Sequence, residues 1–234
     1  DTCAAIDVGG TSTDVSAIYQ GVPEISASGS VVGGWKTRVK AMKMETSATG
    51  GDSHVWITDR DIKIGPRRVI PLCVAAAEHP ALLQKLNQMR LLPRKSLDEN
   101  YQPTKFLIRT KYAINDLNKE ETEMLKYIGS DPISIHELYT SMRAMPSGKV
   151  IDSLIKKRLV QAIGFTPTDA LHVRGEYTVW NADASHAGAE LLSRYNGRKK
   201  YEFCTHVKEH VAKNMAYSQM AFLLSEKSKP LVDE

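Results

Sequence analysis

The sequence predicts a mixed α/β fold, and three observations support that prediction. Short apolar segments separated by glycine, proline and polar turns fill residues 1–80, as is typical of β-strands. Apolar residues at helical spacing dominate residues 80–226. Three short helical segments and then a strand-like tail within residues 115–180 follow the element order of a winged helix-turn-helix. We therefore expect a β-rich part over residues 1–114, a winged-helix-like module over 115–180 and a helical part over 181–234.

The first part of the chain is expected to be built from short strands. The clearest two, residues 3–8 and 14–19, flank a glycine turn. Weaker strand patterns cover residues 31–32, 39–44, 55–57 and 62–64. Residues 58–61 between the last two strands are polar and predict a hairpin turn.

The helices are predicted from apolar periodicity. This spacing covers residues 80–92, 117–128, 133–142, 147–160, 182–194 and 206–224. Small residues on one face of the segment 182–194 predict close packing against a neighbour. The segment 176–180 is predicted to be the strand that follows the three helices of the winged-helix-like module.

The composition excludes several classes of protein. With 42% hydrophobic and 25% charged residues, the chain is neither disordered nor fibrous as a whole. A net charge of +4 is too small to indicate a nucleic-acid partner by itself. The three cysteines lie far apart, which favours a reducing, cytoplasmic setting over a disulfide framework or a structural zinc site. No apolar run approaches the roughly 18 residues of a membrane span, so we expect no membrane association.

The most informative segment reads DVGGTSTDV, residues 7–15. Gly9 and Gly10 allow the backbone to approach a ligand closely because they lack a Cβ atom. Successive N–H groups in such a turn can surround an anion. Hydroxyl groups that could add further donors belong to Thr11, Ser12 and Thr13. The segment therefore predicts a phosphate-binding turn, and the alternative is a plain hairpin with a hydroxyl-rich loop.

Two carboxylates flank this turn. Asp7 ends the first predicted strand and Asp14 begins the second. Carboxylate oxygens hold Mg²⁺ directly or through water, and phosphoryl transfer depends on such positioning and charge neutralisation. We therefore assign the catalytic roles to Asp7, which would hold Mg²⁺, and Asp14, which would orient water or the metal. The expected ligands of the turn are therefore nucleotide phosphates and Mg²⁺.

The stretch IDVGGTSTDVSAIYQG resembles the hydantoinase A/5-oxoprolinase family, within the actin, heat-shock chaperone and sugar-kinase superfamily. Three further stretches are similar to motifs of that family. SATGGDS at 47–53 resembles its second glycine loop, IGPRR at 64–68 its VGPR stretch, and FTPTDALHVRG at 165–175 its PTDA signature. The resemblance extends over about residues 1–190.

The resemblance implies an actin-like (ribonuclease H-like) half-domain with the winged-helix-like module inserted. It implies an ATP-dependent amidohydrolase that activates and hydrolyses a small cyclic amide. The phosphate-binding residues would be Gly9, Gly10, Thr11, Ser12 and Thr13 in the first loop, and Gly50 and Gly51 in the second. Alternatives are a carboxylase subunit or small-molecule kinase of the same superfamily, or a nucleotide-responsive regulator with a winged helix.

The sequence departs from the family pattern in two ways. Asp52 stands where a third glycine is expected, and its charge would either repel a phosphate or bind a metal. The first nucleotide loop and the late glycine-rich loop of the family are missing. Because the chain also begins inside a strand-like segment, we expect a piece of a longer parent that is inactive alone. A second subunit or the remaining domains would complete the cleft.

Two weaker pairs remain open. Asp169 and His172 are spaced i, i+3 and can share a helix face as metal ligands or as an acid/base pair. The alternative is that Asp169 marks a helix start and His172 packs beside it. Asp52 and His54 form a second such pair.

The winged-helix-like module is not expected to bind nucleic acid. Acidic and basic side chains are equal in number over residues 115–160, whereas a DNA reader carries a basic excess. Packing, or docking of a partner subunit, is the expected role of this module.

Overall fold

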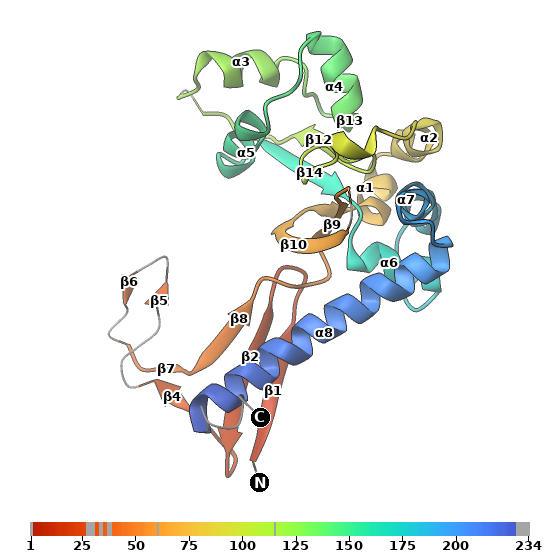
Figure 1. The fold of residues 1–234 in the computed structure, drawn as a ribbon. Coiled ribbons are helices and arrows are strands. Elements are labelled where there is room, and N and C mark those ends of the chain that lie inside the picture. Colours follow the sequence, from red (N-terminus) through yellow and green to blue (C-terminus); the bar gives the residue numbers. More distant parts are fainter. Residues whose placement is uncertain are drawn as a thin grey trace. The chain divides into compact units, whose positions relative to one another are not determined.

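The computed structural model describes residues 2–26, 31–32, 35–36, 39–59, 61–114 and 116–227 of the chain (Figure 1). It is a mixed α/β structure with several small sheets, as predicted from the sequence. The chain divides into two compact units. The first unit comprises residues 1–51 with 210–234, and the second unit comprises residues 52–209.

The first unit is built on an antiparallel hairpin. β1 (Thr2–Val8) pairs with β2 (Thr13–Tyr19) along its whole length, from Thr2 opposite Tyr19 to Val8 opposite Thr13. β3 (Val22–Pro23) and β8 (Met44–Ser47) both pair with β2. Two short ladders join β4 (Ile25–Ser26) to β7 (Ala41–Met42) and β5 (Val31–Val32) to β6 (Trp35–Lys36). The strands predicted at 3–8 and 14–19 are confirmed.

The second unit contains a hairpin and a four-stranded sheet. β9 (Ser53–Ile57) and β10 (Ile62–Arg68) form the hairpin, whose predicted turn is closed by the Thr58 N–H donating to the Asp61 carbonyl at 2.9 Å. The sheet has the order β11 (Ile70–Pro71), β14 (Val160–Gly164), β12 (Phe106–Arg109), β13 (Ile133–Ser134). β11 runs parallel to β14, and the other two pairings are antiparallel.

The helices of the chain follow β11, and the last of them begins in the second unit and continues into the first (Figure 1). They are α1 (Leu72–Glu78), α2 (Ala81–Gln88), α3 (Lys119–Leu125), α4 (Ile135–Met142), α5 (Gly148–Lys156), α6 (Pro167–Arg174), α7 (Ala182–Asn196) and α8 (Lys200–Lys227), with a 3-10 turn at Arg94–Ser96. α3, α4 and α6 begin with capping boxes, in which the first side chain and the residue three positions later satisfy each other's backbone N–H groups. Local sequence therefore determines where these helices start.

The predicted strand at 176–180 is wrong. α6 ends at Gly175, whose φ of 71° reverses the chain, and no described strand lies beside the residues that follow. Tyr177, Val179 and Trp180 are exposed there. The strand that pairs beside β13 and β14 is β12, which precedes the three helices in the sequence and lies between those two strands in the sheet.

The helix predicted at 147–160 is shorter than expected. It stops early because Arg158 adopts a positive φ and β14 begins at Val160. α1 was not predicted.

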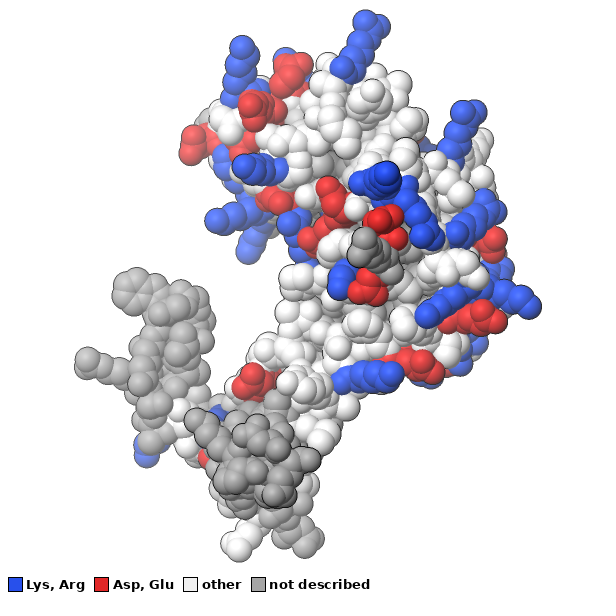
Figure 2. Space-filling view, viewed as in Figure 1, with Lys and Arg blue, Asp and Glu red and all other residues white. Residues whose placement is uncertain are grey.

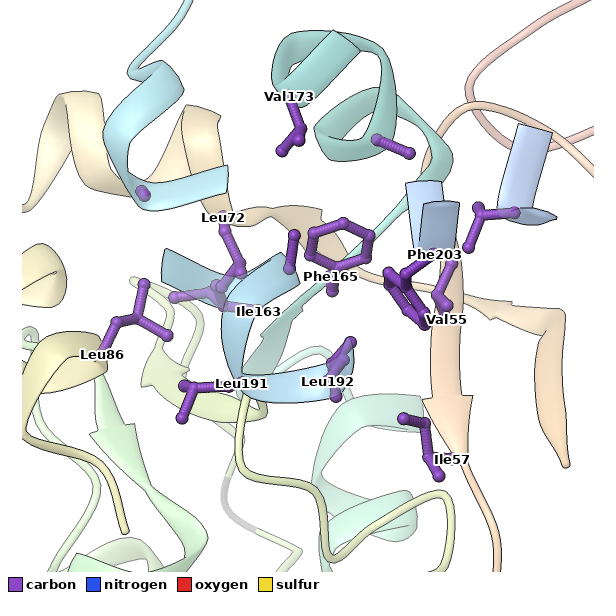
Figure 3. Packing of buried hydrophobic residues seen from close by; sticks show 14 of the residues in the cluster. Val55, Ile57, Leu72, Leu86, Ile163, Phe165, Val173, Leu191, Leu192 and Phe203 are labelled. Carbon is purple, nitrogen blue, oxygen red and sulfur yellow. The ribbon is translucent and has the colours of Figure 1, made fainter. Parts of the chain in front are cut away.

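Two apolar cores stabilise the second unit. The larger core joins β9, β14 and the helices around them, including Val55, Leu72, Phe165 and Phe203 (Figure 3). The phenyl rings of Phe165 and Phe203 lie 5.7 Å apart in a tilted arrangement. The smaller core joins α3, α4 and α5 to the sheet. A Cβ atom at Gly188 of α7 would overlap the Leu72 side chain, which confirms the predicted close packing of that small-residue face.

Candidate functional site

The tip of the β1–β2 hairpin carries the first glycine loop. The Gly9 N–H donates to the Ser12 carbonyl at 2.8 Å, which closes the turn. Gly10 and Thr11 form its two-residue tip, and their N–H groups make no hydrogen bond with any residue that the structure describes. Both residues are exposed. The turn therefore leaves two consecutive backbone donors available to an anion.

The second glycine loop packs directly against the first. Gly50 is buried, and a Cβ atom on it would lie 2.6 Å from the Gly9 carbonyl oxygen and 2.7 Å from the Gly10 carbonyl oxygen. The Gly51 N–H donates to the Gly9 carbonyl at 3.2 Å. The buried Thr13 hydroxyl donates to the Thr49 carbonyl at 2.7 Å. The two loops predicted separately thus form one backbone surface, which a side chain at position 50 would disrupt.

The two carboxylates that flank the turn face each other across the hairpin. Asp7 and Asp14 are direct partners in the β1–β2 ladder, so their side chains project from the same face. Asp14 accepts hydrogen bonds from Thr46 Oγ1 at 2.5 Å and from Ser12 Oγ at 3.5 Å. Asp7 is exposed, and its carboxylate has no hydrogen bond or ion pair within the described part of the chain. Like charges placed opposite each other are destabilising, and a cation between them would remove that cost.

This carboxylate pair supplies only part of a metal site. Across the ranges that the structure describes, no group of three or more His, Cys, Asp or Glu side chains is arranged to hold a metal ion. Mg²⁺ often binds through one or two carboxylates and takes its other ligands from water and phosphate oxygens. Asp7 and Asp14 fit that partial role.

Asp52, which stands where the resemblance leads us to expect a glycine, is neutralised by an arginine. Arg68 Nη2 and Nε lie 2.9 Å and 3.1 Å from Asp52 Oδ2. Arg68 belongs to the IGPRR stretch that also resembles the family. Asp52 is not hydrogen-bonded to His54, whose buried ring nitrogens have no partner among the described residues. The structure pairs Asp52 with Arg68, and a joint role for Asp52 and His54 stays a prediction that the proposal below does not use.

The helix-start interpretation of Asp169 is confirmed. Asp169 is fully buried at the third position of α6 and completes the capping box with Thr166. Its carboxylate also accepts from the N–H groups of Leu72 and Cys73, at 3.1 Å and 2.9 Å, and from the Ser185 hydroxyl at 2.7 Å. It thereby connects α1, α6 and α7. Burial raises the pKa of Asp169, and these hydrogen bonds oppose that shift.

His172 lies on the same helix, and both of its ring nitrogens are hydrogen-bonded to protein groups. Its Nδ1 lies 2.8 Å from the Thr168 carbonyl, and its Nε2 accepts from the Trp180 N–H at 3.1 Å. The Tyr177 ring packs edge-on against it. A metal-binding role for Asp169 and His172 stays a prediction, and the proposal below does not use it.

The sequence analysis did not identify Thr46 and Thr49 as parts of the site. Thr49 lies in the SATGGDS stretch, but nothing in that motif marks its carbonyl as the partner of Thr13. The pairing of β8 with β2 places Thr46 opposite Asp14. A strand-pairing prediction for residues 44–47 would have found Thr46.

Comparison with protein families supports the resemblance seen in the sequence. Residues 1–75 match the family described as hydantoinase/oxoprolinase. The match includes both glycine loops, Asp52 and the IGPRR stretch. The resemblance is therefore confirmed over this part of the chain.

A solved structure extends the likeness to the fold of the whole chain. The nucleotide-free structure of an acetone carboxylase, from work on the mechanism of ATP-dependent acetone carboxylation, matches 98% of this chain with a TM-score of 0.53. The sequence identity is 12%, so the likeness concerns the fold alone. The chain covers 22% of that carboxylase chain. Comparison with curated proteins found no match.

One further observation concerns membranes. Among the helices of residues that the structure describes, none is both long and apolar enough to cross a bilayer.

Proposed function

We propose that this chain forms the phosphate-binding part of an ATP-dependent enzyme of the hydantoinase/5-oxoprolinase type, which hydrolyses small cyclic amides. The observation that carries the proposal is the contact of Gly50 with Gly9 and Gly10. A plain hairpin does not need a second glycine loop against its tip. A site where backbone donors must come close to a ligand does need one.

Some residues of the two loops would contact the phosphate, and the others would hold the loop backbone in place. Gly10 and Thr11 would donate their N–H groups to a phosphate, and the Thr11 and Ser12 hydroxyls would add to them. Gly9, Gly50 and Gly51 would shape the surface, because the Gly9 N–H is occupied by Ser12. Thr13 would hold the loops together through Thr49.

Asp7 and Asp14 would hold the Mg²⁺ that accompanies the nucleotide. Their oxygens are the ligands that Mg²⁺ prefers, and their opposed positions favour a cation. Bound Mg-ATP would supply the phosphoryl group that activates the amide oxygen of the substrate. This chain would orient that nucleotide and neutralise its charge.

At the level of the fold, we infer an actin-like half-domain carrying a winged-helix-like module. The antiparallel hairpin with the paired glycine loops supports the first part. α3, α4 and α5 on the sheet β13–β12–β14 support the second. Figure 2 shows acidic and basic side chains intermixed on the face drawn, and this supports a protein-docking or packing role over nucleic-acid binding.

Further polypeptide would complete the cleft, from a second subunit or from additional domains. β1 is an edge strand among the described strands, and its Ile6 and Val8 side chains are 47% and 53% exposed. An apolar edge of this kind is normally covered by another strand or element. The small share of the acetone carboxylase chain that this chain covers supports the same expectation.

Calorimetric titration of Mg-ATP into the chain assembled with the polypeptide that completes the cleft tests the nucleotide proposal. The wild type is expected to bind, and Gly50→Ala is expected to lose binding, because the added Cβ atom displaces the Gly9–Gly10 backbone. Gly129→Ala is the matched control, since a Cβ atom there meets nothing within 4 Å. Absence of binding by the wild type, or equal binding by Gly50→Ala, would contradict the proposal.

A second candidate function is ATP-dependent carboxylation. The fold similarity to acetone carboxylase favours it over the other members of the superfamily. ADP release by the chain together with the polypeptide that completes the cleft can be measured with a cyclic amide, such as hydantoin or 5-oxoproline, and separately with a ketone plus bicarbonate. Stimulation by the cyclic amide alone supports the first function, and stimulation by the ketone mixture supports the second. Asp7→Asn is expected to abolish either response, whereas Asp59→Asn, on an exposed turn, is expected to keep it.

A further inference from the structure

A cavity of about 450 Å³ lies in the second unit, remote in sequence from the glycine loops. It is bordered by the end of α2, by residues 89–93 that follow it, and by the start of α4. Ligand pockets commonly measure about 300–1,000 Å³. The cavity is therefore large enough for a small organic molecule.

The walls of this cavity are held in place without a ligand. Lys85 of α2 donates to the Pro132 carbonyl at 2.7 Å and pairs with Glu137 of α4 at 2.9 Å. On the other wall, the Tyr195 hydroxyl accepts from the Leu92 N–H at 2.6 Å and donates to the Leu92 carbonyl at 3.1 Å. A site whose walls are already fixed loses little entropy when it binds.

The lining combines apolar surface with one unmatched charge. Met89, Leu92 and Tyr101 provide apolar and aromatic surface. The charge of Lys85 is balanced by Glu137. Arg90 also lines the cavity, is exposed, and has no ion pair or hydrogen bond in the described part of the chain. The unmatched charge at the cavity is therefore positive.

The start of α4 also borders the cavity, through Ser134 and His136. The capping box between Ser134 and Glu137 already satisfies the N–H groups of these two residues, so Arg90 is the cationic group that a ligand would meet. A guanidinium group favours planar anions such as carboxylates, which it can bind through two hydrogen bonds.

We propose that this cavity binds a small organic anion, a carboxylate on an aromatic or aliphatic body. The apolar body would lie against Met89, Leu92 and Tyr101, and the carboxylate would pair with Arg90. This site is separate from the phosphate-binding loops and does not depend on the function proposed for them.

Chemical-shift mapping by ¹H–¹⁵N NMR tests the proposal, with phenylacetate as the probe and its neutral amide, phenylacetamide, as the matched control. Phenylacetate is expected to cause saturable shifts at the amides of residues 88–92 and 134–137. Phenylacetamide is expected to bind about tenfold more weakly, because it lacks the charge that Arg90 recognises.

Two variants complete the experiment. Arg90→Gln is expected to weaken phenylacetate binding about tenfold and to leave phenylacetamide binding unchanged. Arg94→Gln, a nearby exposed arginine outside the cavity lining, is expected to bind as the wild type does. Equal binding of the two probes, shifts outside the cavity, or an unchanged Arg90→Gln variant would overturn the proposal. Mg-ATP titration of Arg90→Gln is expected to match the wild type, which separates this site from the proposed function.

Discussion

The two units of the chain differ in what maintains their structure. In the first unit, the buried apolar cluster of described residues is Val15 and Ala17, with Tyr19 packed beside them. The second unit has two extensive cores. The proposed phosphate site lies on the first unit, where backbone pairing and glycine contacts set the geometry. Binding loops commonly belong to the less stable parts of a protein, and this chain follows that pattern.

The second unit also buries charged groups, whereas none is buried among the described residues of the first unit. Lys105 is almost fully buried and donates to the Glu99 carbonyl at 3.0 Å and to Asn100 Oδ1 at 2.7 Å. Burial lowers the pKa of Lys105 to about 8. Arg67 pairs with Asp152 and, at 3.1 Å, with Glu99. This network connects β10, the loop before β12, and α5.

The largest effect expected from this difference is on stability. Phe165→Ala should lower the free energy of unfolding by about 3–5 kcal/mol, because it empties a fully buried position in the larger core. Val15→Ala should instead speed amide hydrogen exchange in β1 and β2 and leave exchange in α7 unchanged. Denaturant unfolding and residue-resolved exchange measure the two effects. If Val15→Ala destabilised α7 as well, the two units would have to unfold together.

A change of pH is expected to have an intermediate effect on the free energy of unfolding. His54 is fully buried in the second unit, and burial, followed by the charges of Lys105 and Arg67, lowers its pKa well below the usual value. Below about pH 6.5, the unfolded chain binds a proton at His54 that the folded chain does not. The free energy of unfolding should therefore fall with decreasing pH, by up to about 1.4 kcal/mol per unit.

Denaturant titrations between pH 7.5 and 5 on the wild type and on His54→Leu would measure this slope. The variant should lose that part of the pH dependence. The exposed His136→Gln is the control and should retain it. Identical slopes for the wild type and His54→Leu would show that His54 is not held neutral.

The smallest effect is expected at the junction of the two units in the sequence. Asp52→Gly restores the glycine of the family pattern and removes an ion pair whose arginine side chain is 62% exposed. Exposed pairs contribute little, so the free energy of unfolding should change by less than about 1 kcal/mol. Mg-ATP affinity should also stay near the wild-type value, because Arg68 already neutralises Asp52. A large gain in affinity would show instead that Asp52 repels the nucleotide.

Local features of the sequence were enough to predict much of the structure. The glycine turn between two apolar strands predicted the hairpin that carries the proposed site, and the structure has it at β1 and β2. Periodicity predicted most helices. The starts of three helices are also set locally. The capping boxes at Asn118, Ser134 and Thr166 each involve residues only three positions apart.

By itself, then, the sequence determined the residue types of the proposed site, its hairpin and the starts of several helices, because those features depend on neighbours along the chain. Tertiary structure decided which distant segments meet. It placed Gly50 on Gly9, paired Arg68 with Asp52, buried Asp169 between three helices and inserted β12 between β13 and β14. Those contacts depend on strand pairing and on the hydrogen bonding of buried polar groups. The partners are distant in the sequence, so local patterns do not identify them.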